Sequence, residues 1–158
     1  MSDDASPAPN TTTVTAVWAG DQRFAVSSVR GGAITIDIDR VAGTGPVDTL
    51  LGALAACSAS DVLEILAKRR TPAERLAIVV RGERRAQPPR RLVRAELEFR
   101  IDGAGIEAVH AERAIALSVD KYCSVATSLA PDIALSSVLV LNGERHAPQP
   151  RSAVAPPG

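Results

Sequence analysis

Two cysteines are the residues of this sequence with the most chemistry to offer. Cys57 lies in the middle of the apolar stretch LLGALAACSASDVLEIL, and Cys123 lies in DKYCSVATSL. A cysteine can pack as a small hydrophobic residue, or its thiolate can react with peroxides, disulfides or metals. Because free cysteines are usually buried, packing is the default interpretation. The neighbours of each cysteine must therefore decide between packing and chemistry.

The polar neighbours of Cys57 favour chemistry. Ser60 and Asp61 follow it by one helical turn, so on a helix they share its face. A carboxylate on an otherwise buried helix needs a partner, and a basic group is the one we expect. A thiol beside paired charges in an apolar setting can have a shifted pKa.

Cys123 stands where a helical segment is predicted to begin. Unpaired backbone N–H groups at the start of a helix and the nearby Lys121 both favour a thiolate at this position. The alternative is that Cys123 only fills space behind Tyr122. No CxxC motif joins the two cysteines, and their distance in sequence does not tell whether the sulfurs meet.

Other kinds of site find little support. His110 and His146 have no metal-ligand spacing with each other or with the cysteines, so we expect no metal. P-loop, GxGxxG and GxSxG motifs are absent, and no cofactor is indicated. Lys plus Arg and Asp plus Glu balance at 18 each, and aromatic residues are few. We therefore expect no nucleic-acid partner.

Composition indicates a cytoplasmic globular protein. The chain has 158 residues, 46% of them hydrophobic, which is enough for a core. Its first ten residues, MSDDASPAPN, lack the basic and apolar regions of a secretory signal. No apolar run is expected to reach membrane-spanning length, so no membrane partner is predicted. In a reducing cytoplasm a disulfide is more often redox-active than structural.

Hydrophobic periodicity predicts the elements that position the cysteines. Alternating residues predict strands around 14–18, 24–26, 34–38, 76–80, 93–101 and 133–141. Pro46 suits the first turn of a long helix reaching about Arg70, and further helices are predicted from Ile106 to Val119 and over CSVATSLA. We predict antiparallel hairpins rather than βαβ units, hence an α+β fold.

The predicted organisation is one domain over 13–142, with disordered tails over 1–12 and 143–158. Apolar and small side chains surround most of the long helix, so it must be covered on several sides. One small domain offers limited cover, and a second subunit packed over this helix is expected.

Two segments, GPVDTLLGALAACSASDVLEILAKRR and LSVDKYCSVATSL, resemble in this order the OsmC and Ohr proteins, a family of osmotically inducible and organic-hydroperoxide-resistance proteins. The likeness covers roughly Val14 to Leu141 and is greatest for the YhfA-like branch, where Asp61 and GERR have counterparts. It implies an OsmC-like α+β fold, with antiparallel β-sheets packed on a long central helix in an intertwined homodimer.

The resemblance also implies an activity in oxidative-stress defence. Cys57 would be the peroxidatic thiolate that attacks an alkyl or lipid hydroperoxide, Cys123 would resolve the product as a disulfide, and a dithiol reductant would restore both. Arg23 is the approximate match to an arginine that holds the thiolate in this family. The position of the glutamate that orients this arginine is Val47, and Asp48 points about 100° away on a helix.

Three functions follow from these observations. The first is thiol-dependent reduction of organic hydroperoxides, which both cysteine segments favour. The second is a non-catalytic OsmC-fold dimer that binds a small apolar ligand, which Val47 favours. The third is a redox module whose cysteines form a disulfide without peroxide turnover.

Overall fold

The computed structural model describes residues 10–152, which divide between Leu50 and Leu51 into two compact units. The sequence predicts a single domain over 13–142, and the described part of this range contains both units. Most of the predicted N-terminal tail, 1–12, lies outside the described residues. Each unit is described below by itself.

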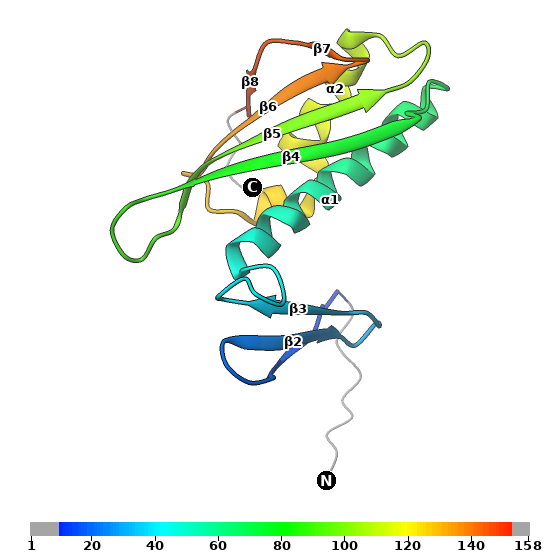
Figure 1. Ribbon diagram of the computed structural model, residues 1–158. Coiled ribbons are helices and arrows are strands. Elements are labelled where there is room, and N and C mark those ends of the chain that lie inside the picture. The colour runs from blue at the N-terminus through cyan, green and yellow to red at the C-terminus, as the bar shows by residue number, and fades with distance from the viewer. Residues whose placement is uncertain (1–9, 153–158) are drawn as a thin grey trace. The chain divides into compact units, whose positions relative to one another are not determined.

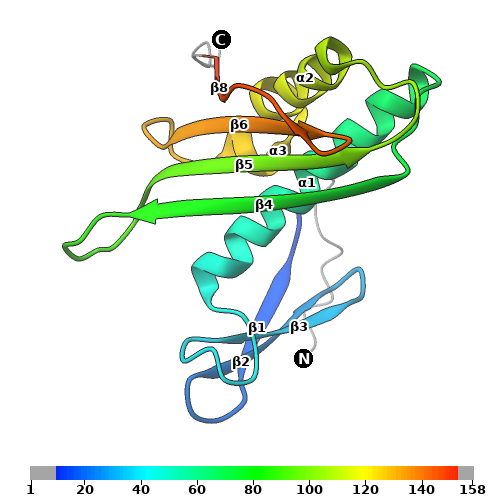
Figure 2. The same ribbon diagram turned by 45° about the horizontal axis from the view of Figure 1, so that its top comes forward.

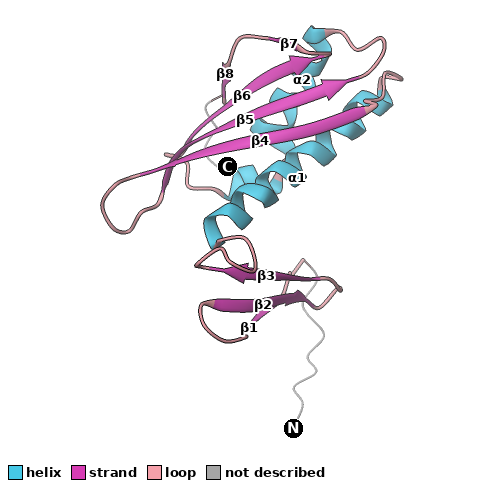
Figure 3. Ribbon diagram, in the orientation of Figure 1, coloured by secondary structure: helices cyan, strands magenta, loops and turns pink. Residues whose placement is uncertain are grey.

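The N-terminal unit is a three-stranded antiparallel meander, as predicted. Its strands are β1 (Val14–Trp18), β2 (Arg23–Ser28) and β3 (Ala33–Asp37), in the order β1-β2-β3 (Figure 3). After β3, the buried carboxylate of Asp37 accepts hydrogen bonds from the backbone N–H groups of Val41 (3.1 Å) and Ala42 (2.8 Å). These bonds fix the loop that leads into the long helix, and they hold the pKa of Asp37 below its usual value.

The long helix α1 (Pro46–Lys68) begins at the predicted proline and ends two residues before the predicted Arg70. Proline suits a first turn because its missing N–H has no intrahelical acceptor there, and Lys68 suits the negative end of the helix dipole. The fully buried residues Leu54, Val62 and Leu66 share one face.

By length and composition α1 could also cross a membrane, which corrects the expectation that no apolar run reaches that length. A core helix of a soluble protein passes the same test, because burial in protein and burial in lipid select the same residues.

The C-terminal unit holds a mixed five-stranded sheet (Figure 1). Its strands are β4 (Arg75–Arg84), β5 (Leu92–Asp102), β6 (Ala134–Leu141), β7 (Glu144–Arg145) and β8 (Gln149–Pro150). β4 and β5 form the predicted antiparallel pair, but β5 and β6 are parallel. The expectation of purely antiparallel sheets is therefore wrong.

A helical crossover explains the parallel pair. Between β5 and β6 the chain forms α2 (Ala108–Leu117), the π-helical turn η1 (Ser118–Tyr122) and α3 (Ser124–Ser128). Such a crossover returns the chain to the starting end of the sheet, so the next strand runs parallel. The part of α1 in this unit, α2 and α3 lie on one face of the sheet (Figure 2).

Strand β5 supplies the centre of the core. Its alternate side chains Ala95, Leu97, Phe99 and Ile101 are fully buried and pack in one cluster with residues of α1, α2, α3 and β6. The strict alternation in the sequence predicts this buried face correctly.

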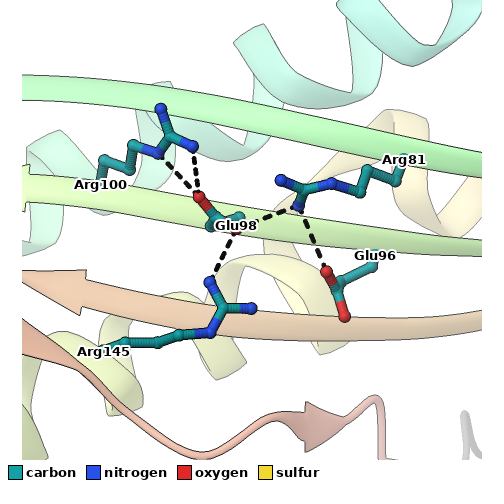
Figure 4. A network of polar contacts seen from close by, with 5 residues as sticks. All are labelled: Arg81, Glu96, Glu98, Arg100 and Arg145. Atoms are coloured by element: carbon teal, nitrogen blue, oxygen red, sulfur yellow. Dashed lines mark hydrogen bonds and ion pairs between the residues drawn. The ribbon is translucent and has the colours of Figure 1, made fainter.

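The opposite face of β5 carries a network of ion pairs centred on Glu98 (Figure 4). The buried carboxylate accepts hydrogen bonds from Arg100 (2.7 Å), Arg81 (3.0 Å) and Arg145 (2.8 Å), which come from β5, β4 and β7. Arg81 also reaches Glu96 at 3.3 Å. The three guanidinium groups lower the pKa of Glu98 to about 2. Because they come from different strands, their ion pairs with Glu98 join β4, β5 and β7.

The residues after β6 form two short strands up to Pro150, whereas the sequence predicts a disordered tail over 143–158. Asn142 and Gly143 both have positive φ angles, 48° and 86°, and turn the chain back so that β7 pairs with β6. An Asn-Gly pair is a strong hairpin signal, which the proline-rich composition of the segment obscures. β8 then pairs with the other end of β6, and residues 153–158 lie outside the described range.

Candidate active site

Cys57 lies on α1 with its thiol partly buried. Leu54 and Ser58, on either side of it along the helix, are fully buried, so Cys57 stands at the border between the core and the surface. A small molecule can approach the thiol of a cysteine at this border, whereas it cannot reach the thiol of a fully buried cysteine.

Cys123 stands between η1 and α3, where the backbone is extended. Its N–H donates to the carbonyl of Ser118 at 2.8 Å, and its sulfur accepts a hydrogen bond from the N–H of Ala126 at 3.3 Å. The sulfur thus caps α3, and the side chain is fully buried. The predicted place of Cys123 at a helix start is confirmed.

The fold brings the two cysteines together. Cys57 lies near the Cys123 thiol, close enough to raise its pKa, and the neighbouring Ser58 hydroxyl donates to Cys123 Sγ at 3.4 Å. The α2-η1-α3 crossover produces this meeting, because it places the start of α3 against α1.

Burial raises the pKa of the Cys123 thiol, and the adjacent Cys57 raises it further. The hydrogen bonds from Ser58 and Ala126 act in the opposite direction but do not outweigh burial. The expectation that the helix start and Lys121 favour a Cys123 thiolate is therefore wrong. Lys121 instead lies over the ring of Tyr122, with its Nζ 5.3 Å from the ring centroid.

Asp61 lies beside the cysteine pair, but its partner differs from the expected basic group. Its carboxylate accepts a hydrogen bond from the hydroxyl of Ser118 at 2.9 Å, and that hydroxyl also lies 3.3 Å from the carbonyl of Ser58. Ser58 and Ser118 thus connect α1 to η1 around the thiols. Neither serine is predicted from the sequence, because the sequence alone does not tell which groups a serine hydroxyl contacts in the fold.

The predicted arginine, Arg23, lies in β2 and pairs with Asp21 at 2.7 Å. Its role toward Cys57 stays a prediction. Near the start of α1, where the sequence has Val47, the next residue Asp48 binds an arginine instead: Arg40 Nε donates to its carboxylate at 2.6 Å. The N-terminal unit therefore holds two arginines paired with carboxylates, Arg23 with Asp21 and Arg40 with Asp48.

Comparison with known proteins identifies the family that this chain matches. The model of the OsmC-like protein family matches residues 39–137. Protein YhfA of Escherichia coli K12 is 33% identical over 113 residues, which are 71% of this chain and 84% of YhfA.

Solved structures share the fold. A crystal structure of a hypothetical protein from Aquifex aeolicus VF5 superposes with a TM-score of 0.76 at 26% identity, over 85% of this chain and 98% of that chain. The organic hydroperoxide resistance protein OhrB of Bacillus subtilis superposes with a TM-score of 0.55 at 14% identity, over 84% and 98% of the two chains. At that identity the likeness to OhrB shows the fold alone.

Proposed function

The chain belongs to the OsmC-like protein family, and from this premise we propose that it reduces organic hydroperoxides through a cycle of Cys57 and Cys123. The observation that carries the proposal is that a partly buried thiol, Cys57, lies near a fully buried thiol, Cys123. The name of the structural relative OhrB, an organic hydroperoxide resistance protein, supports the same class of substrate.

The first step takes place at Cys57. Its thiolate sulfur attacks the terminal, hydrogen-bearing oxygen of a hydroperoxide ROOH, the O–O bond breaks, and the departing alkoxide takes a proton from water and leaves as the alcohol ROH. Cys57 is then a sulfenic acid, two electrons more oxidised. The more accessible of the two sulfurs is the one that meets the substrate.

The second step takes place at Cys123. Its sulfur attacks the Cys57 sulfenic acid, a disulfide forms, and the sulfenic oxygen leaves as water with the thiol proton. The high pKa of Cys123 keeps this thiol protonated until then, and the hydrogen bonds from Ser58 and Ala126 assist as negative charge develops on the sulfur. An external dithiol reduces the disulfide by two exchange steps and is itself oxidised to a disulfide.

A positive charge must hold the Cys57 thiolate, since a thiol reacts slowly with peroxide. Arg23 is the candidate by its position in the sequence. We propose Arg23 for this role, as the resemblance to the family implies.

We also propose a homodimer. α1 leaves Leu50 and Leu63 exposed to 39% and 42% in the single chain, although most large apolar side chains of a soluble helix are covered. Light scattering during size-exclusion chromatography tests this point. A molar mass twice that of the 16.5 kDa chain is expected, and a monomer at micromolar concentration would contradict it.

Turnover tests the proposed function. The reduced protein with dithiothreitol should consume cumene hydroperoxide continuously, while Cys57→Ser should consume it no faster than dithiothreitol alone. Equal rates for the two proteins would exclude the peroxidase function. Unreactive thiols together with a copurified apolar molecule in native mass spectrometry would favour the ligand-binding alternative, for which Val47 is the supporting residue.

A further inference from the structure

A π-helical turn, η1, directly precedes Cys123. The hydrogen bonds of a π-helix span five residues instead of four, and such turns are rare and often lie at functional sites. Here the backbone carbonyl of Ser118 accepts a hydrogen bond from the N–H of Cys123 at 2.8 Å, which closes the turn. Ser118 therefore fixes the backbone position of Cys123, five residues later in the chain.

The side chain of Ser118 binds α1. The residue is fully buried, and its hydroxyl donates to the carboxylate of Asp61 at 2.9 Å and lies 3.3 Å from the carbonyl of Ser58. Among residues 10–152 this hydroxyl is the one hydrogen-bond or ion-pair partner of the Asp61 carboxylate. Ser118 thus binds α1 with its side chain and Cys123 with its carbonyl.

The acceptors of Ser118 lie close to Cys57 on α1. Asp61 follows Cys57 by four residues, so the two share one face of the helix, and Ser58 is the next residue after Cys57. All three belong to one continuous helix of 23 residues. The contacts of Ser118 therefore hold the backbone of Cys123 to the same helical turn that carries Cys57.

The other contacts of Cys123 act on its sulfur. The hydroxyl of Ser58 donates to it at 3.4 Å and the N–H of Ala126 at 3.3 Å. Sulfur is a weak acceptor, whereas the hydroxyl of Ser118 binds a carboxylate oxygen. The stronger link between Cys123 and α1 thus runs through Ser118 and Asp61.

We propose that Ser118 is a positioning residue for the disulfide between Cys57 and Cys123, and that Asp61 acts through it. This inference rests on the proposed two-cysteine cycle. The sulfur of Cys123 attacks the sulfur of the Cys57 sulfenic acid, the S–S bond forms, the S–O bond breaks, and the oxygen leaves as water with the thiol proton. Because a disulfide needs a narrow range of distances and angles, a Cys123 backbone held against α1 raises the effective concentration of its thiol at Cys57.

The equilibrium between the dithiol and disulfide forms in dithiothreitol redox buffers tests the proposal without any hydroperoxide. It measures the effective concentration of the two thiols. Ser118→Ala should lower this concentration about tenfold, in line with the loss of a hydrogen bond to a charged group. Asp61→Ala should lower it by a similar factor, whereas Asp61→Asn should keep most of it, because an amide oxygen still accepts from the Ser118 hydroxyl.

A single turnover with cumene hydroperoxide separates positioning from general damage to the fold. Loss of the peroxide follows the reaction of Cys57, and the mass of the quenched chain follows the disulfide. In Ser118→Ala the first rate should stay within about twofold, while the second should fall about tenfold. The matched control is Ser128→Ala in α3, which removes an exposed hydroxyl that bonds to the Ser124 carbonyl of the same helix and should change neither rate.

The outcomes distinguish this inference from the proposed function. Equal effective concentrations in Ser118→Ala and the unchanged protein, an equal slowing of both steps, or an Asp61→Asn variant as impaired as Asp61→Ala would overturn the role of Ser118. If Ser118→Ala does not fold, Asp61→Ala takes its place, since Asp61 is only half-buried. An unchanged protein that forms the disulfide in dithiothreitol buffers but consumes no peroxide would overturn the peroxidase function alone, and one that forms no disulfide would overturn both.

Discussion

Replacing Glu98 with glutamine tests how the sheet of the C-terminal unit is held together. The substitution keeps the shape of the side chain but removes the charge that Arg81, Arg100 and Arg145 share. In the folded protein the pKa of Glu98 is about 2, compared with 4.5 for an ordinary glutamate. Since a pKa difference of one corresponds to about 1.4 kcal/mol, the ion pairs stabilise the fold by at most ~3.5 kcal/mol. The three arginines are about half exposed, so water screens them, and we expect about 1–2 kcal/mol.

The pH dependence has a defined sign. Because the pKa of Glu98 is lower in the folded than in the unfolded chain, its contribution to stability is complete above about pH 4.5 and disappears as the pH falls toward 2. Urea unfolding at pH 7, 5, 4 and 3 should therefore show a difference between the unchanged protein and Glu98→Gln that narrows as the pH falls.

A matched control lies on the same sheet. Glu83→Gln removes an exposed carboxylate that lies 3.8 Å from Arg94, and it should change the free energy of unfolding by less than about 0.5 kcal/mol. An equal effect of the Glu98 and Glu83 substitutions at pH 7, or a difference for Glu98 that does not depend on pH, would refute the assignment of a shared charged centre.

Further variants address the active site and the core. Cys123→Ser should accumulate the Cys57 sulfenic acid, detected by dimedone labelling, and continuous turnover by this variant would contradict the resolving role of Cys123. Ser58→Ala removes a donor to Cys123, so the pKa of that thiol should rise further and disulfide formation in a single turnover should slow several-fold; an unchanged rate would exclude the role of Ser58. Arg23→Gln should slow the reaction of Cys57 with peroxide about tenfold, and an unchanged rate would exclude this role for Arg23. Leu66→Ala should lower the free energy of unfolding by about 2–5 kcal/mol in chemical denaturation, and a loss below 1 kcal/mol would contradict its place in the core.

Local patterns predict most of the secondary structure. The proline at position 46 and the strict alternation along β5 each act over a few residues, so α1 and the buried face of β5 are expected correctly. The parallel pairing of β5 with β6 depends instead on where a crossover returns the chain, which no local pattern contains. The hairpin at Asn142 has a local signal, but the prolines that follow it dominate the composition of the segment.

At the candidate site, too, the sequence predicts the local features but not those that depend on the fold. The cysteines stand out by their rarity and by the family resemblance of their segments, whereas their closeness is a property of the fold. The hydroxyl of Ser118 takes the place of the basic group expected beside Asp61, because a neutral donor can satisfy a partly buried carboxylate. The pKa of Cys123 rises because its full burial outweighs its two hydrogen bonds, and burial is known only once the chain is folded.

The mass of the intact chain after reaction with one equivalent of cumene hydroperoxide tests the central claim most directly. A Cys57–Cys123 disulfide removes two hydrogen atoms, so the reduced chain should lose about 2 Da, and dithiothreitol should restore it. Cys57→Ser should keep its mass. A gain of about 16 or 32 Da without the loss would show oxidation of a thiol that its neighbour does not resolve, and would contradict the two-cysteine cycle.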